Sequence, residues 1–191
     1  MFAAQYPNGG FPQIYPLAGG YHDAVTFNDD AMVQVIELLR DIRDGKPELS
    51  FVPSDLRSQA GPCVARAIDC ILATQLKTAD GALSVWCQQH DALTLKPCAA
   101  RNFEPAALCS NESASLAKFL MSIPNPPPRI VAAVNATMVW FDRTAVHNVA
   151  WSRQNGGGQL VARPGAPALW ARMYEFGTNQ PIFGDRDRTV H

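Results

Sequence analysis

The sequence has neither an excess of charge nor a long hydrophobic run, and both absences limit what the protein can bind. It contains 16 Lys and Arg against 17 Asp and Glu, a net charge of −1 at pH 7. Nucleic acids and anionic membranes are poor partners for a chain without a broad basic face. The longest apolar run, 130–141, contains Asn135 and Thr137 and is shorter than the ~20 residues that span a bilayer. Residues 1–5 lack the basic and apolar regions of a signal peptide.

Several motifs of metal-binding and catalytic chemistry are missing as well. The five cysteines are odd in number and none belongs to a Cys-x-x-Cys motif, so a zinc site or a complete disulfide framework is not indicated and we expect buried thiols. His22, His90 and His147 lack the four-residue spacing of a helical metal pair. No Gly-x-Ser-x-Gly motif or Cys-His arrangement is evident, so the usual nucleophilic hydrolases are not indicated.

Hydrophobic spacing predicts an all-α fold. With 191 residues, 47% of them hydrophobic, residues 1–191 can form one domain with a continuous core. Apolar residues recur at helical intervals from Met32 to Ile42, and Gly45 and Pro47 end that pattern. Further helices are predicted over 54–77, 111–123, 129–142 and 170–177, with 129–142 buried on all sides and 144–167 a flexible surface excursion. No strand-like alternation is sustained, which favours helical hairpins arranged around a groove.

The densest group of polar side chains lies within residues 19–32. A glycine loop there leads into the first long helix and brings together His22, Asp23, Asn28, Asp29 and Asp30. One interpretation is structural, because Asn28 is a good helix N-cap and carboxylates in the first turn interact favourably with the helix dipole. The other is functional, because such side chains supply the oxygen ligands that Ca²⁺ or Mg²⁺ prefers. We therefore expect a metal or polar-substrate site at the start of this helix.

Carboxylates and arginines elsewhere leave two further chemistries open. A pair of acids for glycoside hydrolysis can be drawn from Asp29, Asp30, Asp91, Glu104 and Glu112, although the sequence gives no distance between them. Residues 86–105 form a long polar connection of a kind that is usually functional. Arg101, Arg172 and Arg186 lie in apolar blocks interrupted by Gly or Pro. Since a guanidinium group binds a carboxylate through two hydrogen bonds, these arginines indicate an acidic ligand.

A series of short blocks, in the same order, resembles the signature of the family 10 polysaccharide lyases, which are pectate lyases. The blocks are Asn8–Gln13, Tyr15–Pro16, Gly20–Asp23, Thr26–Met32, Trp86–Asp91, Ala100–Pro105, Glu112–Ser113, Trp170–Tyr174 and Pro181–Asp187. The resemblance is collinear over nearly the whole chain. So many ordered blocks are far more specific than any single motif above.

The resemblance implies a partial α/α toroid of helical hairpins around a substrate groove, and cleavage of polygalacturonate by Ca²⁺-assisted β-elimination. Asp29 matches the calcium-binding carboxylate of the family. Arg101 and Arg172 match arginines that contact substrate carboxylates, and Arg186 matches the arginine taken as the catalytic base. Abstraction of the C5 proton spreads negative charge onto the C6 carboxylate, where cations stabilise it.

The resemblance also implies that this chain is part of a longer lyase domain. In the family, a block with an Asp-Asn pair precedes the turn at Gln5 and Tyr6, and the C-terminal region continues beyond Asp187. Two alternatives to the enzyme remain: a fragment that binds oligogalacturonate without cleaving it, and a fragment whose exposed helix faces bind other proteins. By resemblance we expect a monomer that is secreted or periplasmic.

Overall fold

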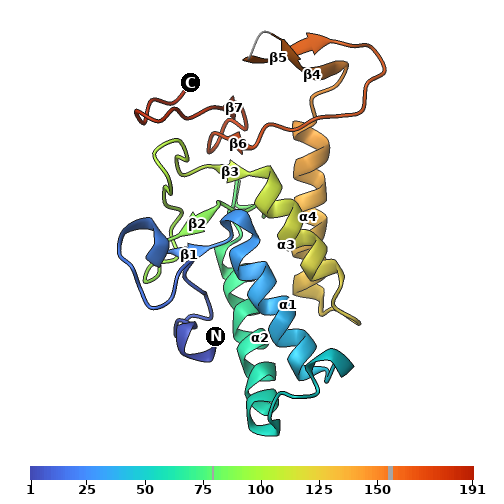
Figure 1. Ribbon diagram of the computed structural model, residues 1–191. Helices are drawn as coiled ribbons and strands as arrows, with labels where there is room; N and C mark the ends of the chain where they lie inside the picture. The colour runs from blue at the N-terminus through green and yellow to red at the C-terminus, as the bar shows by residue number, and fades with distance from the viewer. Residues whose placement is uncertain (79, 155–156) are drawn as a thin grey trace.

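The computed structural model describes residues 1–78, 80–154 and 157–191 (Figure 1). Within them, the four α-helices are α1 (Ala31–Arg43), α2 (Ser54–Thr74), α3 (Ser110–Met121) and α4 (Pro128–Thr144). Short 3-10 helices cover Phe2–Ala4, Gly20–Asp23, Asn28–Asp30 and Pro47–Leu49. The strands are β1 (Val25–Thr26), β2 (Gln89–His90), β3 (Leu108–Cys109), β4 (Val149–Gln154), β5 (Gly157–Ala162), β6 (Met173–Tyr174) and β7 (Pro181–Ile182).

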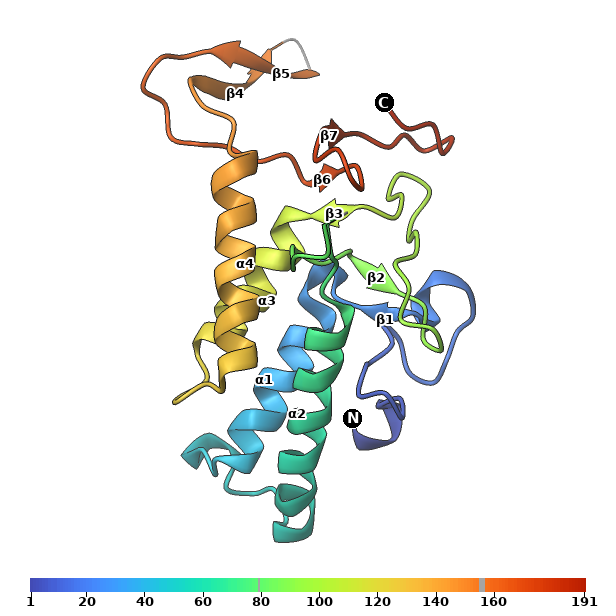
Figure 2. The ribbon, with the colours of Figure 1, turned by 180° about the vertical axis from the view of Figure 1, so that it is seen from behind.

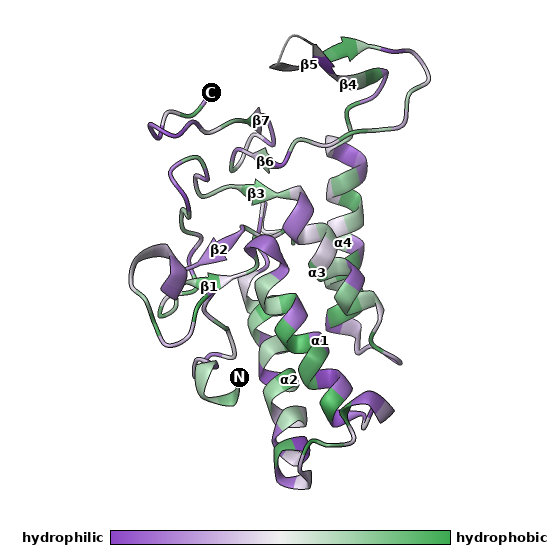
Figure 3. Ribbon diagram, in the orientation of Figure 1, coloured by the Kyte–Doolittle hydropathy of each residue, from purple (hydrophilic) through white to green (hydrophobic). Residues whose placement is uncertain are grey.

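The helices form the main hydrophobic core. Helix α1 packs against α2 and α3, and α4 packs against α3 and α2, as the two opposite views show (Figures 1 and 2). Met32, Ile36 and Leu39 form the predicted stripe of α1 and are fully buried, in one cluster with Ile71 of α2 and Leu116 of α3. Each helix carries both hydrophobic and hydrophilic bands (Figure 3), as expected where one face is buried.

Short strands gather at the end of the helical layer where α1 and α3 begin (Figure 1). There β1 pairs with β2, and β6 lies between β3 and β7, all antiparallel. The longer β4–β5 hairpin lies beyond the end of α4 (Figures 1 and 2). The pairing of β3 with β6 places the start of α3 beside Arg172, and Asn28, before α1, contacts the same arginine.

The prediction of an all-α toroid is wrong, because the chain has a mixed helix and strand structure. The five strands outside the hairpin have only two residues each, which is too short for an alternating pattern to be recognised. The region 144–167, predicted as a flexible excursion, contains the β4–β5 hairpin, apart from Asn155 and Gly156, which lie outside the described residues. The region 170–177, predicted as a helix, contains β6.

Two other expectations have mixed outcomes. Helix α4 is buried along one face only, and Val131, Met138 and Val139 on it are exposed, so the prediction of a helix buried on all sides is wrong. The five cysteines are free thiols, buried except for Cys98, which is partly exposed, in agreement with the expected buried thiols. Burial raises the pKa of Cys70 to about 12. No helix among the described residues is long and apolar enough to span a membrane.

Candidate functional site

The entry to α1 has an unusual backbone that separates Asn28 from Asp29. The N–H groups of Phe27 and Asn28 both donate to the Gln88 carbonyl oxygen, each at 3.0 Å. Asp29 and Asp30 then adopt left-handed conformations, with φ of 54° and 58°, which aspartate tolerates better than most residues. Asn28 is buried while the Asp29 side chain is 55% exposed. The chain thus turns one polar side chain inward and its neighbour outward.

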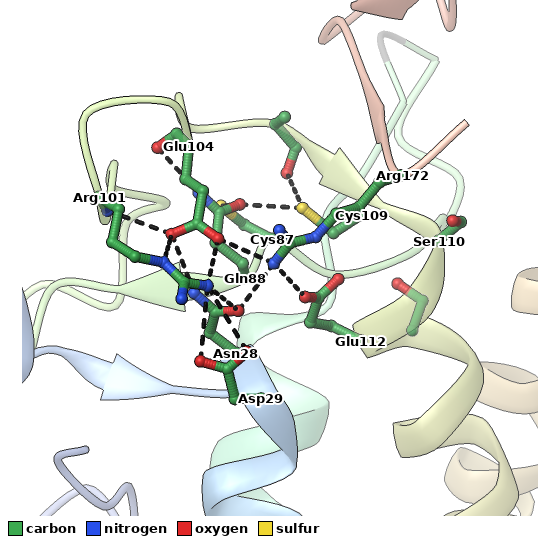
Figure 4. Close-up of polar contacts among 12 residues, drawn as sticks. Asn28, Asp29, Cys87, Gln88, Arg101, Glu104, Cys109, Ser110, Glu112 and Arg172 are labelled. Carbon is green, nitrogen blue, oxygen red and sulfur yellow. Dashed lines mark hydrogen bonds and ion pairs between the residues drawn. The ribbon is translucent and has the colours of Figure 1, made fainter. Parts of the chain in front are cut away.

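Asn28 does not act as the predicted helix cap. The residue before α1 is Asp30, and no side-chain hydrogen bond caps this helix. The Asn28 amide instead donates from Nδ2 to Glu104 Oε2 at 3.1 Å, and its Oδ1 accepts from an Arg172 Nη2 at 2.8 Å. Asn28 therefore links residues that are far apart in the sequence (Figure 4).

Glu104 is the carboxylate on which the site is assembled. Its side chain is 0% exposed, and Arg101 donates to it from Nε and Nη2, both at 2.6 Å. Arg172 Nη2 lies 2.9 Å from Glu104 Oε1, the oxygen that also accepts from Arg101 Nη2. Burial raises the pKa of Glu104, but the hydrogen bonds from Arg101, the charge of Arg172 and the bond from Asn28 outweigh it and lower the pKa overall. Glu104 therefore stays ionised and holds two guanidinium groups together.

Glu112, in the first turn of α3, is a second buried partner of Arg172. Its Oε1 accepts from Arg172 Nη2 at 3.0 Å, and its Oε2 is buried without a hydrogen-bond partner among the described residues. Burial acts to lower the pKa of Arg172, but the charge and hydrogen bond of Glu112, together with Glu104, raise it. The same partner effect from Glu104 raises the pKa of Arg101. Both arginines are therefore fixed in the charged form.

Each of the two arginines still has donors for a ligand. The Arg101 and Arg172 side chains are 34% and 37% exposed. Within residues 1–78, 80–154 and 157–191, no hydrogen bond of either Nη1 atom is found, since the bonds described above use Nε or Nη2. Two rigidly held guanidinium groups with remaining donors can bind carboxylates of an acidic ligand.

Arg186 lines an open groove together with Arg101 of this cluster. The groove has a volume of about 670 Å³ and is lined by Arg101, Phe103 and Arg186, among others. Gly184 lies so close to the Phe103 carbonyl that a Cβ atom would approach its oxygen to 2.5 Å, and Arg188 Nε donates to Asn102 at 3.2 Å. These contacts hold the C-terminal turn against the loop that carries Arg101. Arg186 is exposed, and no ion pair of its side chain is found in the described part of the chain.

The polar group predicted within residues 19–32 is only partly brought together. Asp29 lies at the arginine cluster, with its carboxylate oxygens 3.4 and 3.5 Å from Arg101 Nη2. Asp23 accepts from the N–H groups of Ala18 and Gly19, each at 3.0 Å, and has a structural role in its own loop. His22 packs against the ring of Tyr21. The tight spacing in the sequence therefore overstated how many of these residues share one site.

Asp29 can be one ligand of a calcium ion, but the described residues around it do not form a complete calcium site. Among the described residues, no group of three or more His, Cys, Asp or Glu side chains could hold a metal ion. Ca²⁺ takes about six to eight oxygen ligands, and Glu104 and Glu112 are already paired with arginines. An ion at Asp29 would need further oxygens from a bound ligand, from water or from groups outside the described residues.

The sequence did not reveal the residues that hold the arginines. The sequence predicts Glu104 and Glu112 as candidate acids for glycoside hydrolysis and has them in two of the blocks of the resemblance, but it gives neither a role toward the arginines. Gln88 lies in another block and is not singled out. Gln88 Nε2 donates to the carbonyl oxygens of Glu104 and Pro105, at 3.3 and 2.7 Å. The signal that could have been used is the spacing of Arg101 and Glu104, three residues apart in a polar loop.

The chain is similar to known polysaccharide lyases. A family model described as pectic acid lyase matches residues 1–191. A solved structure of a mutant family 10 polysaccharide lyase from Cellvibrio cellulosa, in complex with trigalacturonic acid, is similar with a TM-score of 0.93 and 33% identity. The similarity covers 100% of this chain and 60% of the Cellvibrio cellulosa chain.

A second solved structure of the Cellvibrio cellulosa family 10 lyase gives a TM-score of 0.92 and 34% identity, with 99% of this chain and 59% of that chain covered. Among curated proteins no match was found. The chain thus spans less than two thirds of the length of the solved structures that it resembles. Because the family model covers the whole chain, the protein belongs to the pectic acid lyase family.

Proposed function

We propose that this chain supplies the substrate-binding and proton-abstracting side chains of a lyase that cleaves polygalacturonate by β-elimination. The observation that carries the proposal is the pair Arg101 and Arg172, both held on the buried carboxylate of Glu104 with donors remaining. Family membership and the trigalacturonic acid in a similar structure support the same ligand class. Because such a polymer does not cross membranes, we also propose that the lyase acts in the extracellular or periplasmic space.

The proposed reaction removes the proton at C5 of a galacturonate residue. The electron pair of that C–H bond forms a double bond between C4 and C5, the C4–O4 bond breaks, and the leaving oxygen takes a proton. Negative charge builds up on the C6 carboxylate as the proton leaves. Arg101 and Arg172 bind that region of the substrate and stabilise this charge, because they are oriented in advance and stay protonated.

Arg186 is proposed as the group that takes the C5 proton. It lines the same groove as Arg101, and no carboxylate pairs with it among the described residues. Arg101 is less suited to this role, because Glu104 raises its pKa and stabilises its charged form. Ca²⁺ bound at Asp29 would add positive charge beside the substrate carboxylates.

The proposal is tested by mixing the chain with polygalacturonate and following the absorbance of the unsaturated product, with Ca²⁺ and with a chelator. Turnover that requires Ca²⁺ supports the lyase. Binding of oligogalacturonate without any turnover would favour the alternative of a fragment that only binds. A chain that neither binds nor cleaves would contradict both.

Replacement of Asp29 by alanine is expected to raise the Ca²⁺ concentration needed for half-maximal turnover by about tenfold or more, because an anionic ligand is lost. Asp69→Ala is the matched control, since Asp69 is an exposed carboxylate of α2 that pairs with Arg129. The measurement is turnover against Ca²⁺ concentration. The same curve for parent and Asp29→Ala would remove Asp29 from the metal site.

Arg101→Lys and Arg172→Lys are each expected to raise KM and to lower kcat/KM by about ten- to a hundredfold. Lysine keeps the positive charge but loses the planar, two-pronged contact with a carboxylate. Arg129→Lys on α4 is the control, because Arg129 is 61% exposed and lies away from the cluster. If the two variants behave like the Arg129 control, the arginine pair has a structural role only.

A further inference from the structure

A second cavity lies next to Arg172, between the β4–β5 hairpin and the segment 169–183. Its volume is about 350 Å³, within the range of roughly 300–1,000 Å³ that is common for ligand sites. Trp151, Leu160, Trp170 and Phe183 line it, and Arg172 is the charged residue in the lining. Because Arg172 also bonds to Glu104 and Glu112, this cavity adjoins the arginine cluster of the candidate site.

The hairpin presents an aromatic ring and a cation on the same face. Trp151 pairs with Leu160, and Arg153 pairs with Gly158. Alternate residues of a strand share a face, so Arg153 lies on the face that carries Trp151. The Trp151 ring extends over Gly158, where a Cβ atom would come within 2.0 Å of it. Glycine at 158 therefore allows the indole to lie against the neighbouring strand.

Two arginines bring positive charge to this region. Arg172 lies in the lining of the cavity, although it is paired with Glu104 and Glu112, and Arg153 lies on the hairpin face that carries Trp151. Trp151, Trp170 and Phe183 are 57%, 40% and 57% exposed, so part of each aromatic side chain is accessible to a ligand. Exposed aromatic side chains beside Arg153 match a ligand that has both an apolar face and negative charge.

We propose that this cavity is an additional galacturonan subsite, in which a sugar ring stacks on Trp151 and its carboxylate pairs with Arg153. This inference rests on the proposed function, because it extends the polymer from Arg172 toward the hairpin. A galacturonate residue has the required chemistry, with C–H groups on one face of the ring and a carboxylate at its edge. A neutral sugar lacks the charge, and a purely apolar ligand has no group for Arg153.

The test is binding of galacturonate oligomers by isothermal titration calorimetry, with the chain as it stands and at fixed ionic strength. Trp151→Ala is expected to weaken binding of a hexamer by about tenfold and to leave binding of a trimer within about twofold. Arg153→Gln is expected to weaken binding of the hexamer by about threefold. Trp151→Tyr, which keeps an aromatic ring, should restore most of the hexamer affinity.

Phe51→Ala is the matched control, because Phe51 is another exposed aromatic residue, at 78%, outside the cavity. Equal hexamer affinity for parent and Trp151→Ala, or equal losses for trimer and hexamer, would overturn the subsite but leave the proposed function intact. A parent chain that binds neither oligomer would overturn both. Binding of a neutral glucose hexamer as tight as that of the galacturonate hexamer would exclude the anionic ligand.

Discussion

Replacement of Arg186 by alanine is expected to lower kcat on polygalacturonate by more than about a hundredfold, the usual effect of losing a general base. Affinity for oligogalacturonate should change by only a few-fold, because this group acts mainly in the transition state. The measurement pairs initial rates of unsaturated product with binding by calorimetry. Arg163→Ala, another exposed arginine, is the control.

Arg186→Lys tests whether proton abstraction depends on the position of the side chain or on its basicity. A lysine has a free pKa near 10.4 and loses its proton more readily than arginine, for which deprotonation at pH 9 costs about 5 kcal/mol. A lysine side chain differs from arginine in length and shape, so we expect Arg186→Lys to be as inactive as Arg186→Ala. The parent should turn over faster as pH rises, because the neutral fraction of the base increases.

One pattern of results would move the base to another residue. If Arg186→Ala keeps more than about a hundredth of the parental kcat while Arg101→Lys abolishes turnover, then Arg101 takes the C5 proton. That result would mean that the ion pair with Glu104 orients the base rather than keeping it charged. The two variants therefore assign the role between Arg101 and Arg186, which both line the groove.

Glu104→Gln is the substitution with the largest expected effect on the structure of the site. It keeps the shape of the side chain and removes the charge that holds Arg101 and Arg172. Breaking a buried pair costs about 3–5 kcal/mol, and since both arginines are about one third exposed, we expect a loss of about 2 kcal/mol in the free energy of unfolding. We expect kcat/KM to fall by more than about tenfold, because the guanidinium groups are no longer oriented.

The pH dependence of stability provides an independent readout for Glu104. Its pKa is lowered in the folded protein, so the ionised form stabilises the fold above the pKa of the unfolded chain, about 4.3. This contribution is lost as pH falls through the lower, folded pKa. Denaturant unfolding between pH 7 and pH 3 should show a steeper loss for the parent than for Glu104→Gln. Glu37→Gln, at an exposed carboxylate that pairs with Arg40, is the control.

The sequence predicted the four α-helices of the described residues well, because in each of them apolar residues recur at helical intervals over several turns. The apolar stripe of α1 and the end at Gly45 could be read directly from residue spacing, and the structure has them within two residues. The ordered blocks led to Asp29, Arg101, Arg172 and Arg186, and the structure brings the first three together and has Arg186 in the lining of the groove beside Arg101. Their individual roles stay predictions.

What the sequence did not predict depends on contacts between distant segments. Asn28 looked like a helix cap, but its amide bonds to Glu104 and Arg172, which are 76 and 144 residues away. The two-residue strands exist only because a partner segment is placed beside them, so no local pattern encodes them. The β4–β5 hairpin has enough length to be recognised, but its three consecutive glycines favoured an interpretation as a loop.

The fixed arginines have a consequence for the entropy of binding. A free arginine side chain carries about 2 kcal/mol of rotamer entropy that is lost when a ligand immobilises it. In this site Arg101 is already held by the two hydrogen bonds that it donates to Glu104, and Arg172 by Asn28, Glu104 and Glu112. Much of that loss has therefore occurred on folding, and a carboxylate ligand meets preorganised donors. The site should superpose closely in its free and ligand-bound forms, with the adjustment made by the flexible sugar chain.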